Sequence, residues 1–368
     1  MRILHILPMN KLSGAEKLSL EICKNMKIYE PIVVCGGNEL KNFFDRENIK
    51  AYTIEFNEIG LKKSLKELRE IIIKKNIRLV HAHDNNASIK ALLTKKIYKL
   101  DIKVISHIHN CYPWLVGKNK IKLIDYIFRK GYDHNITCGK LVYNFYTQNT
   151  NYVNDKNTTI LSNCIDVKGI SNRKIDNIES VYEEFKIPKD KKILGFIGRM
   201  SEQKGIVDFV NNIAKNKTQF YDCKILLVGN GEQENEVRDI IRLNNMEELF
   251  ILTGYQKDVY KFYPIIDVFF LPSKYEGLPM VILEAMAFKK PIVSMNVGSI
   301  DEVVKNNFNG YIIDKNDYNQ FVDKLLDLKE NKKLQQDFGV NGYIYALANY
   351  NIDDYIDNLI QVYDKLIK

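Results

Sequence analysis

Residues 268–288 read VFFLPSKYEGLPMVILEAMAF, an apolar strand-like segment, a turn and an apolar helix-like segment. The strand is predicted over Val268–Ser273. Gly277 allows a sharp turn after it, and Pro279 suits the first turn of a helix, where its missing N–H costs nothing. A strand that leads through a turn into a helix is the repeating element of α/β proteins, and the rest of the chain continues this alternation.

Glu284 is a single carboxylate inside the apolar run Val281–Phe288. A buried carboxylate without a partner costs several kcal/mol or shifts its pKa, so Glu284 needs a polar partner that the sequence does not show. A bound ligand that offers hydroxyl groups would be such a partner. The alternative is an ordinary strand, turn and helix with one satisfied core glutamate.

A second carboxylate, Glu276, ends the strand-like segment. We expect the free N–H groups of Gly277, Leu278 and Met280 to point out of the positive end of the helix, which is a ready anion site. Glu284 lies roughly 7.5 Å further along the helix axis. One ligand can therefore contact Glu276, the helix start and Glu284 together, and a sugar, a diphosphate and a ribose fit in that order.

Two series of short strands alternate with helical patterns, which indicates two parallel sheets. The first series is predicted at Ile3–Leu7, Pro31–Cys35, Ala51–Glu55, Leu79–His83, Val104–His109, Asn135–Cys138 and Thr159–Leu161. The second is predicted at Lys192–Ile197, Lys224–Val228, Phe250–Thr253, Val268–Leu271, Pro291–Ser294 and Tyr311–Ile313. We predict domains over residues 1–166 and 191–350, a linker over 167–190 and a C-terminal helix over 351–368.

Glu276 and Glu284, with seven residues between them, resemble the E-x7-E motif of the retaining glycosyltransferases of family 4. The resemblance spans essentially the whole chain and is strongest in residues 190–315. It implies the GT-B fold, an α/β architecture of two tandem Rossmann-like domains whose parallel sheets face a central cleft. The first domain would lie on the acceptor side, the second would bind a nucleotide-sugar, and the helix 351–368 would pack back toward the first domain. Glu276 would position the donor sugar, and Glu284 would bind the ribose hydroxyls.

The segment Gly198–Gly205 follows a predicted strand and carries two cations, Arg199 and Lys204. Arg199 can bind a diphosphate through two parallel hydrogen bonds, and Lys204 acts as a point charge. A solvated basic loop is the alternative. The segment resembles the family's G-R-x4-K-G motif, which implies that both cations act on the donor diphosphate during transfer. The resemblance also implies donor contacts at the helix start, from Gly277, Leu278 and Pro279.

Two further segments resemble donor-binding segments of the family. Ser13-Gly14-Ala15-Glu16 is similar to G-G-x-E, with Ser13 in place of the first glycine, and Gly14 would let the backbone approach a phosphate. Thr253–Gln256 is similar to a segment near the nucleobase, which makes Tyr255 a candidate donor contact. In both places a plain turn after a strand is the alternative.

Polar residues end two predicted strands of the first series, namely His81, His83 and Asp84 in one and His107 and His109 in the other. Alternation puts His107 and His109 on one face of their strand. By position, His109 resembles the family's active-site histidine near the donor sugar, and His107 competes for that role. His83, Asp84 and His107 are candidate acceptor contacts. His81, His83 and Asp84 can also be read as metal ligands, but no further Cys or His pattern supports this, and we predict no metal site.

Charge is unevenly distributed. Residues 1–180 carry 30 Lys and Arg against 18 Asp and Glu, a net charge of +12, and residues 181–368 carry 24 against 28, a net charge of −4. A basic first half suits an anionic substrate or an anionic membrane. Residues 114–132 mix apolar and basic side chains, and a basic amphipathic helix there predicts peripheral membrane contact. A surface helix with a core face is the alternative. No nucleic-acid motif occurs, so we expect no such partner.

The sequence contains no D-x-D motif, and we expect neither a metal nor another cofactor. Arg199, Lys204 and the helix start would stabilise the leaving diphosphate instead. The resemblance implies retaining transfer from a UDP-sugar to a hydroxyl of a glycan or lipid-linked acceptor, in bacterial surface-polysaccharide synthesis. An NDP-sugar 2-epimerase and a non-catalytic nucleotide-sugar-binding protein are the alternatives. Scattered cysteines and the lack of a signal-type apolar run predict a cytoplasmic protein, peripheral at most on the inner face of the plasma membrane.

Overall fold

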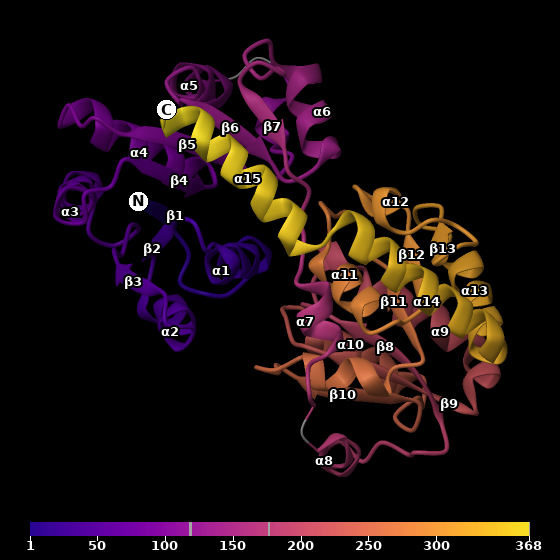
Figure 1. Ribbon diagram of the computed structural model, residues 1–368. Coiled ribbons are helices and arrows are strands. Elements are labelled where there is room, and N and C mark those ends of the chain that lie inside the picture. The colour runs from indigo at the N-terminus through magenta and orange to yellow at the C-terminus, as the bar shows by residue number, and fades with distance from the viewer. Residues whose placement is uncertain (118–119, 176, 368) are drawn as a thin grey trace. The chain divides into compact units, whose positions relative to one another are not determined.

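The computed structural model describes residues 1–117, 120–175 and 177–367 of the chain. The chain divides into two compact units, each with its own parallel sheet (Figure 1). Unit 1 comprises Met1–Ile165 and Ile352–Lys368, and unit 2 comprises Asp166–Asn351. The predicted architecture of two Rossmann-like domains is confirmed by these two sheets.

In the described part of unit 1, seven strands lie in the order β3-β2-β1-β4-β5-β6-β7. The chain builds one side of the sheet outward from β1 and then returns to build the other side from β4. Ligands of such sheets bind at the carboxyl ends of the strands where the order reverses, here β1 and β4. The strands are β1 (Arg2–Leu7), β2 (Glu30–Cys35), β3 (Lys50–Thr53), β4 (Leu79–His83), β5 (Lys103–Ile108), β6 (His134–Thr137) and β7 (Thr158–Ile160).

Helices cover both faces of this sheet, because side chains alternate between the faces along each strand. Ile3 and Leu79 lie in an apolar cluster with residues of α1 and α15, whereas Leu4 and Val80 lie in a cluster with residues of α3 and α4. The last helix, α15, thus belongs to the core of unit 1 (Figure 1, yellow). The helices are α1 (Gly14–Asn25), α2 (Asn38–Arg46), α3 (Leu61–Lys74), α4 (Asn85–Ile97), the short 3-10 helix η1 (Pro113–Leu115), α5 (Lys120–Arg129), α6 (Lys140–Asn149) and α15 (Ile352–Ile367).

Unit 2 repeats the same order of strands. Six strands of its described part lie as β10-β9-β8-β11-β12-β13, so the order reverses between β8 and β11. The strands are β8 (Lys192–Ile197), β9 (Cys223–Val228), β10 (Phe250–Gly254), β11 (Val268–Leu271), β12 (Ile292–Met295) and β13 (Gly310–Ile313). The α-helices are α7 (Val167–Ser171), α8 (Ile178–Glu184), α9 (Ile206–Asn216), α10 (Glu234–Leu243), α11 (Met280–Ala287), α12 (Ile300–Val303), α13 (Tyr318–Glu330) and α14 (Lys332–Asn349). The 3-10 helices are η2 (Glu202–Lys204), η3 (Lys217–Phe220) and η4 (Tyr260–Ile265).

The segment 167–190, for which we predicted a linker, contains α7 and α8, and its described residues belong to unit 2. The Asp166 side chain caps α7 by accepting a hydrogen bond of 2.7 Å from the Gly169 N–H. Val181 of α8 is buried. The polar composition of this segment is that of two short surface helices with side-chain caps, each burying few apolar residues.

Candidate functional site

The loops after β8 and β11 form the candidate site of unit 2. They leave the sheet on either side of the point where the strand order reverses, which is where ligands of such sheets bind. The loop after β8 runs from Gly198 to Gly205, and the loop after β11 runs from Pro272 to Pro279. The predicted diphosphate and sugar contacts therefore lie on neighbouring loops of one sheet edge.

A buried ion pair joins these two loops. Lys204 Nζ donates a hydrogen bond of 2.6 Å to Glu276 Oε1, and Ser273 Oγ donates one of 2.6 Å to the same oxygen. The Lys204 and Glu276 side chains are only 17% and 5% exposed. Gln203 Nε2 also donates to the Tyr275 carbonyl at 3.2 Å. The contacts hold an ammonium and a carboxylate together at the carboxyl ends of β8 and β11.

Gly298, in the loop after β12, supports the backbone of Glu276 from behind. Its φ is +67°, and a Cβ atom there would lie 2.1 Å from the Glu276 carbonyl oxygen. The next residue, Ser299, donates its N–H to the Gly277 carbonyl at 3.0 Å. Only glycine fits this close approach in this backbone conformation. Sequence reasoning missed Gly298, although its position just after a predicted strand was a usable signal.

The buried carboxylate of Glu284 has tyrosine partners from η4. Tyr263 OH donates to Glu284 Oε2 at 2.7 Å, and Tyr260 OH donates to Oε1 at 3.3 Å. Burial, and then the charge of Glu284, raises the pKa of Tyr263 well above its usual value. The tyrosines are the polar partners that the sequence did not show. Pro279 lies just before α11, which begins at Met280, and not inside its first turn.

Arg199 lies on the loop after β8, and Tyr255 lies on the loop after β10 at the same sheet edge. The Arg199 side chain is 72% exposed and pairs with Glu232 at 3.0 Å, not with Glu276. Tyr255 is exposed and follows Gly254, which has a φ of +66°. Both side chains are therefore accessible to a ligand, but the structure does not bring them into the Lys204–Glu276 pair.

Five histidines of unit 1, namely His5, His81, His83, His107 and His109, form one buried cluster because the register of the sheet aligns them. His5 of β1 pairs with His81 of β4, and His83 of β4 pairs with His107 of β5. Sequence reasoning missed His5, which shares its face with the predicted histidines. His109 follows β5 and stacks on His107 with a centroid distance of 4.0 Å. All but the half-buried His109 are fully buried.

Ring nitrogens of the cluster lie at hydrogen-bonding distances. His83 Nε2 lies 3.1 Å from His5 Nδ1, and His83 Nδ1 lies 3.2 Å from His109 Nε2. His81 Nε2 lies 3.2 Å from His107 Nδ1. Burial lowers the pKa of His5 and of His109 to about 4. The same cause, followed by the charges of the neighbouring histidines, lowers the pKa of the other three well below the usual value, so the cluster is neutral near pH 7.

Gly14 and Asp84 lie at the starts of α1 and α4. Gly14 is the first residue of α1, and the space that a Cβ would occupy there is open. Asp84 has a φ of +80° and caps α4, its Oδ1 accepting from the Ala87 N–H at 3.0 Å. Burial raises the pKa of Asp84 to about 6. The cap gives Asp84 a structural role, and the open space leaves Gly14 accessible to a ligand.

The helix α5 buries a polar face and exposes an apolar face, the reverse of a usual amphipathic surface helix. Its buried face carries an ion pair, in which Arg129 Nη2 donates to Asp125 Oδ1 at 2.7 Å. Its exposed face carries large aliphatic side chains that are 46–58% exposed, namely Ile121, Leu123, Ile124 and Ile127. The alternative of a core face with a solvated charged face is therefore wrong for this helix. Lys118 and Asn119 of the predicted segment 114–132 lie outside the described residues.

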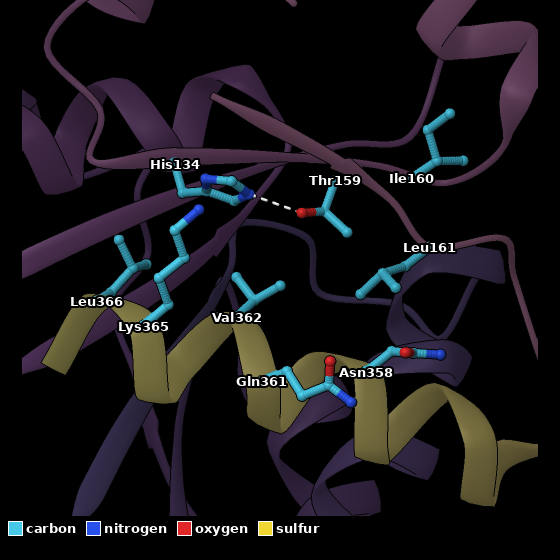
Figure 2. A pocket seen from close by; sticks show the side chains of 9 residues that line it. All are labelled: His134, Thr159, Ile160, Leu161, Asn358, Gln361, Val362, Lys365 and Leu366. Carbon is cyan, nitrogen blue, oxygen red and sulfur yellow. Dashed lines mark hydrogen bonds between the residues drawn. The ribbon is translucent and has the colours of Figure 1, made fainter. Parts of the chain in front are cut away.

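A pocket of about 420 Å³ lies elsewhere in unit 1, between α15 and the edge of the sheet at β6 and β7 (Figure 2). His134 Nε2 lies 2.8 Å from Thr159 Oγ1 on its wall, and Lys365 of α15 lies beside the histidine. The described lining of this pocket contains none of the predicted site residues. No helix within the described ranges has the length and apolar character that a membrane span requires.

Two protein families match the chain. The family described as Glycosyl transferases group 1 matches residues 177–345, and the family described as Glycosyltransferase Family 4 matches residues 14–168. The two matches together contain every predicted site residue. They also divide the chain close to the boundary between unit 1 and unit 2.

Individual relatives match over the whole chain. An Escherichia coli UDP-Gal:alpha-D-GlcNAc-diphosphoundecaprenol alpha-1,3-galactosyltransferase is 22% identical, over 100% of this chain and 97% of its own length. The crystal structure of a glycosyltransferase from Rickettsia africae covers 100% of this chain and 98% of its own, with a TM-score of 0.84 and 21% identity. Anabaena HepE in complex with UDP and glucose covers 99% of this chain and 100% of its own, with a TM-score of 0.87 and 16% identity.

Proposed function

Because the chain belongs to glycosyltransferase family 4 and has the GT-B fold, we propose that it moves a sugar from a UDP-sugar to a hydroxyl of a glycan or lipid-linked acceptor in bacterial surface-polysaccharide synthesis. We further propose that transfer retains the anomeric configuration and needs no metal ion. The E. coli relative is named for a UDP-sugar donor and a diphosphoundecaprenol-linked acceptor, which supports both substrate classes. The UDP complex of Anabaena HepE supports the choice of base.

The observation that carries the proposal is the Lys204–Glu276 pair where the strand order of unit 2 reverses. An ammonium has three donors, and Glu276 takes one of them, which leaves two for the oxygens of a diphosphate. The carboxylate accepts hydrogen bonds from sugar hydroxyls. One end of this pair therefore suits the leaving group, and the other suits the donor sugar.

Further donor contacts follow from the same sheet edge. Arg199, which is exposed, binds the diphosphate when its partner Glu232 releases it. Gly277, Leu278 and Pro279 lead into α11, whose first N–H groups favour an anion. Glu284 binds the ribose hydroxyls, and Tyr263 keeps its carboxylate oriented from inside the unit. Tyr255 contacts the base. In unit 1, Gly14 at the start of α1 contacts a phosphate.

Unit 1 supplies neutral histidine side chains to the proposed reaction. His109 is half-buried and neutral, so it can share a hydrogen bond with a hydroxyl of the donor sugar without adding charge. His83, Asp84 and His107 are the proposed acceptor side. In front-face transfer, the bond from the anomeric carbon to the leaving phosphate breaks while the acceptor oxygen bonds to the same face. The acceptor proton passes to an oxygen of the leaving phosphate, and Lys204 and Arg199 stabilise its charge.

The exposed face of α5 is the proposed membrane contact. Ile121, Leu123, Ile124 and Ile127 present aliphatic surface to solvent, and Lys120 and Lys130 flank them as exposed cations. The polar face of α5 is held to the unit by hydrogen bonds from Arg129 to Asn85 and Asn135 and from Tyr152 to Asp125, which leaves the apolar face to enter the headgroup region. This arrangement would bring the acceptor side to a lipid-linked substrate.

Nucleotide binding tests the donor site. We expect UDP and UDP-sugars, but not GDP, ADP or CMP, to raise the melting temperature of the protein. At one hundred times Kd, ligand binding adds about 2.7 kcal/mol to the free energy of unfolding. Glu284→Ala should abolish this stabilisation. Glu183→Ala, which replaces an exposed glutamate of α8, is the matched control and should keep it. Absence of stabilisation by every nucleotide would contradict the donor site.

Product analysis separates transfer from the alternatives. With a diphosphoundecaprenol-linked sugar as acceptor, we expect UDP release that depends on the acceptor. Release of a free epimerised sugar without acceptor would indicate a 2-epimerase, and binding without turnover would indicate a nucleotide-sugar sensor.

Vesicle sedimentation tests the membrane contact. The double variant Ile124→Gln/Ile127→Gln should lower binding to phosphatidylglycerol-containing vesicles roughly tenfold, because two aliphatic side chains no longer leave water. Ile73→Gln/Ile97→Gln is the control, since these isoleucines are equally exposed on α3 and α4. Equal binding of both double variants would exclude α5 as the contact.

A further inference from the structure

The histidine cluster of unit 1 has the composition and spacing of a metal site. One nitrogen from each of His83, His107 and His109 lies within 4.8 Å of the other two. Two nitrogens on a tetrahedral ion with bonds of about 2.0–2.1 Å are roughly 3.3 Å apart. The separation of 3.2 Å between His83 Nδ1 and His109 Nε2 therefore suits two ligands of one ion as well as it suits a hydrogen bond.

His107 offers a nitrogen that needs a partner. Its Nε2 is buried and, among the residues that the structure describes, has no hydrogen-bond partner. Its Nδ1 lies 3.2 Å from His81 Nε2, and His81 Nδ1 lies 2.6 Å from the hydroxyl of Tyr363. When each Nδ1–H of this chain donates outward, toward Tyr363, the lone pair of His107 Nε2 is left for an ion.

His5 orients His83 in the same way. His83 Nε2 lies 3.1 Å from His5 Nδ1, and an Nε2–H that donates to His5 leaves the His83 Nδ1 lone pair on the side of His109. Metal-binding histidines characteristically donate their second N–H to such a partner, which sets the tautomer and the ring orientation. The cluster thus contains three ligand rings and two supporting rings.

We propose that His83, His107 and His109 bind one divalent transition-metal ion of the Zn²⁺ class, with His5 and His81 orienting two of the three ligands. Imidazole ligands suit Zn²⁺, Cu²⁺, Ni²⁺ and Co²⁺ and exclude the hard cations Mg²⁺ and Ca²⁺. The half-buried His109 gives the ion a route from solvent, which the fully buried group His5, His81 and His83 lacks.

This ion is separate from the proposed transfer, in which His109 acts through a hydrogen bond and no metal takes part. The ion would compete with the donor sugar for His109 and with the acceptor for His83 and His107, a consequence that rests on the proposed function. Metal binding itself does not rest on it, and its test needs no turnover.

The test uses the full chain after chelator treatment, titrated with Zn²⁺ against a chromophoric chelator and with Co²⁺ by visible absorption. We expect one ion per chain and d–d bands of Co²⁺ without a thiolate charge-transfer band. His107→Gln should weaken binding at least about 100-fold, and His5→Gln about 10–100-fold. His134→Gln, which alters the one histidine outside the cluster, is the control and should change nothing.

Circular dichroism identifies variants that fail to fold. If His107→Gln fails to fold, the metal affinity of His109→Gln, at a half-buried position, decides the outcome. Absence of binding by the wild type would overturn the site. Binding that is unchanged in His109→Gln would also overturn it. A thiolate band that disappears in Cys111→Ser would do the same, because it would place the ion on the cysteine two residues after His109.

Discussion

Unit 1 and unit 2 reverse their strand order at the same place but fill that place with different chemistry. In unit 2 the loops after β8 and β11 carry the ion pair of Lys204 and Glu276. In unit 1, β1, β4 and β5 carry neutral imidazoles in ring contact, among them His5, His83 and His107. One order of strands thus offers the same ligand position twice, and the side chains alone decide its charge.

The difference follows from where the polar groups lie, on loops in unit 2 and mostly within strands in unit 1. The pair in unit 2 is on loops, where Ser273 and the backbone of a neighbouring loop support it. The histidines of unit 1 are mostly within strands, where burial makes a charged ring costly and keeps the rings neutral. A site with fixed charges suits a diphosphate, and a site of neutral rings suits hydroxyl groups or a metal ion.

Removing the charge of Glu276 tests the role of the ion pair in unit 2. Glu276→Gln should lower turnover at least about 100-fold, because the donor sugar loses its positioning carboxylate and Lys204 loses its anionic partner. Steady-state kinetics measures the loss. Glu202→Gln is the control, since it makes the same change at an exposed position of the same loop region. Near-normal turnover of Glu276→Gln would remove the central role of the pair.

Adding a methyl group at Gly298 tests the backbone support of Glu276. Gly298→Ala should lower the free energy of unfolding by roughly 2–4 kcal/mol, through backbone strain and the clash with the Glu276 carbonyl, and turnover should fall with it. Gly60→Ala isolates the strain, because Gly60 has a φ of +72° and open space around its Cβ position. Chemical denaturation measures both. Equal losses in the two variants would mean that the loop after β12 yields to the added methyl group.

A smaller effect is expected from acidification, which should lower the free energy of unfolding through His134 of unit 1. The folded pKa of His134 is about 4, lowered first by burial and then by Lys365, whereas the unfolded value is about 6.5. The unfolded chain therefore binds more protons between these two pH values, and stability is lost as pH falls from about 6.5 toward 4. In His134→Gln this part of the loss, about 1–2 kcal/mol, should disappear.

Denaturation at pH 7 and pH 5 measures the difference. Lys365→Gln removes only the neighbouring charge and should reduce the acid loss by less than His134→Gln does. An unchanged pH dependence in His134→Gln would assign the acid loss to other groups.

Much of the fold was predictable because it depends on short-range pattern. Apolar strands followed by helical periods predicted both sheets, and the residues at the strand ends included Glu276, Lys204, His83 and His107. The segment 167–190 was not predictable as part of unit 2, because its two short helices bury few side chains. The orientation of α5 was not predictable either, because two acceptors of hydrogen bonds from Arg129, Asn135 and Asn85, lie on other elements.

The alternation of elements, the family motifs and the uneven charge can be read from the sequence alone, since each of these is local in the chain. Which polar groups contact one another depends on the tertiary structure. Lys204 and Glu276 are 72 residues apart, Tyr263 and Glu284 are 21 apart, and His5 and His83 are 78 apart. Strand order and register bring these residues together, and no single segment encodes the register between two strands. For that reason the carboxylates were visible in the sequence, whereas the pairs that they form were not.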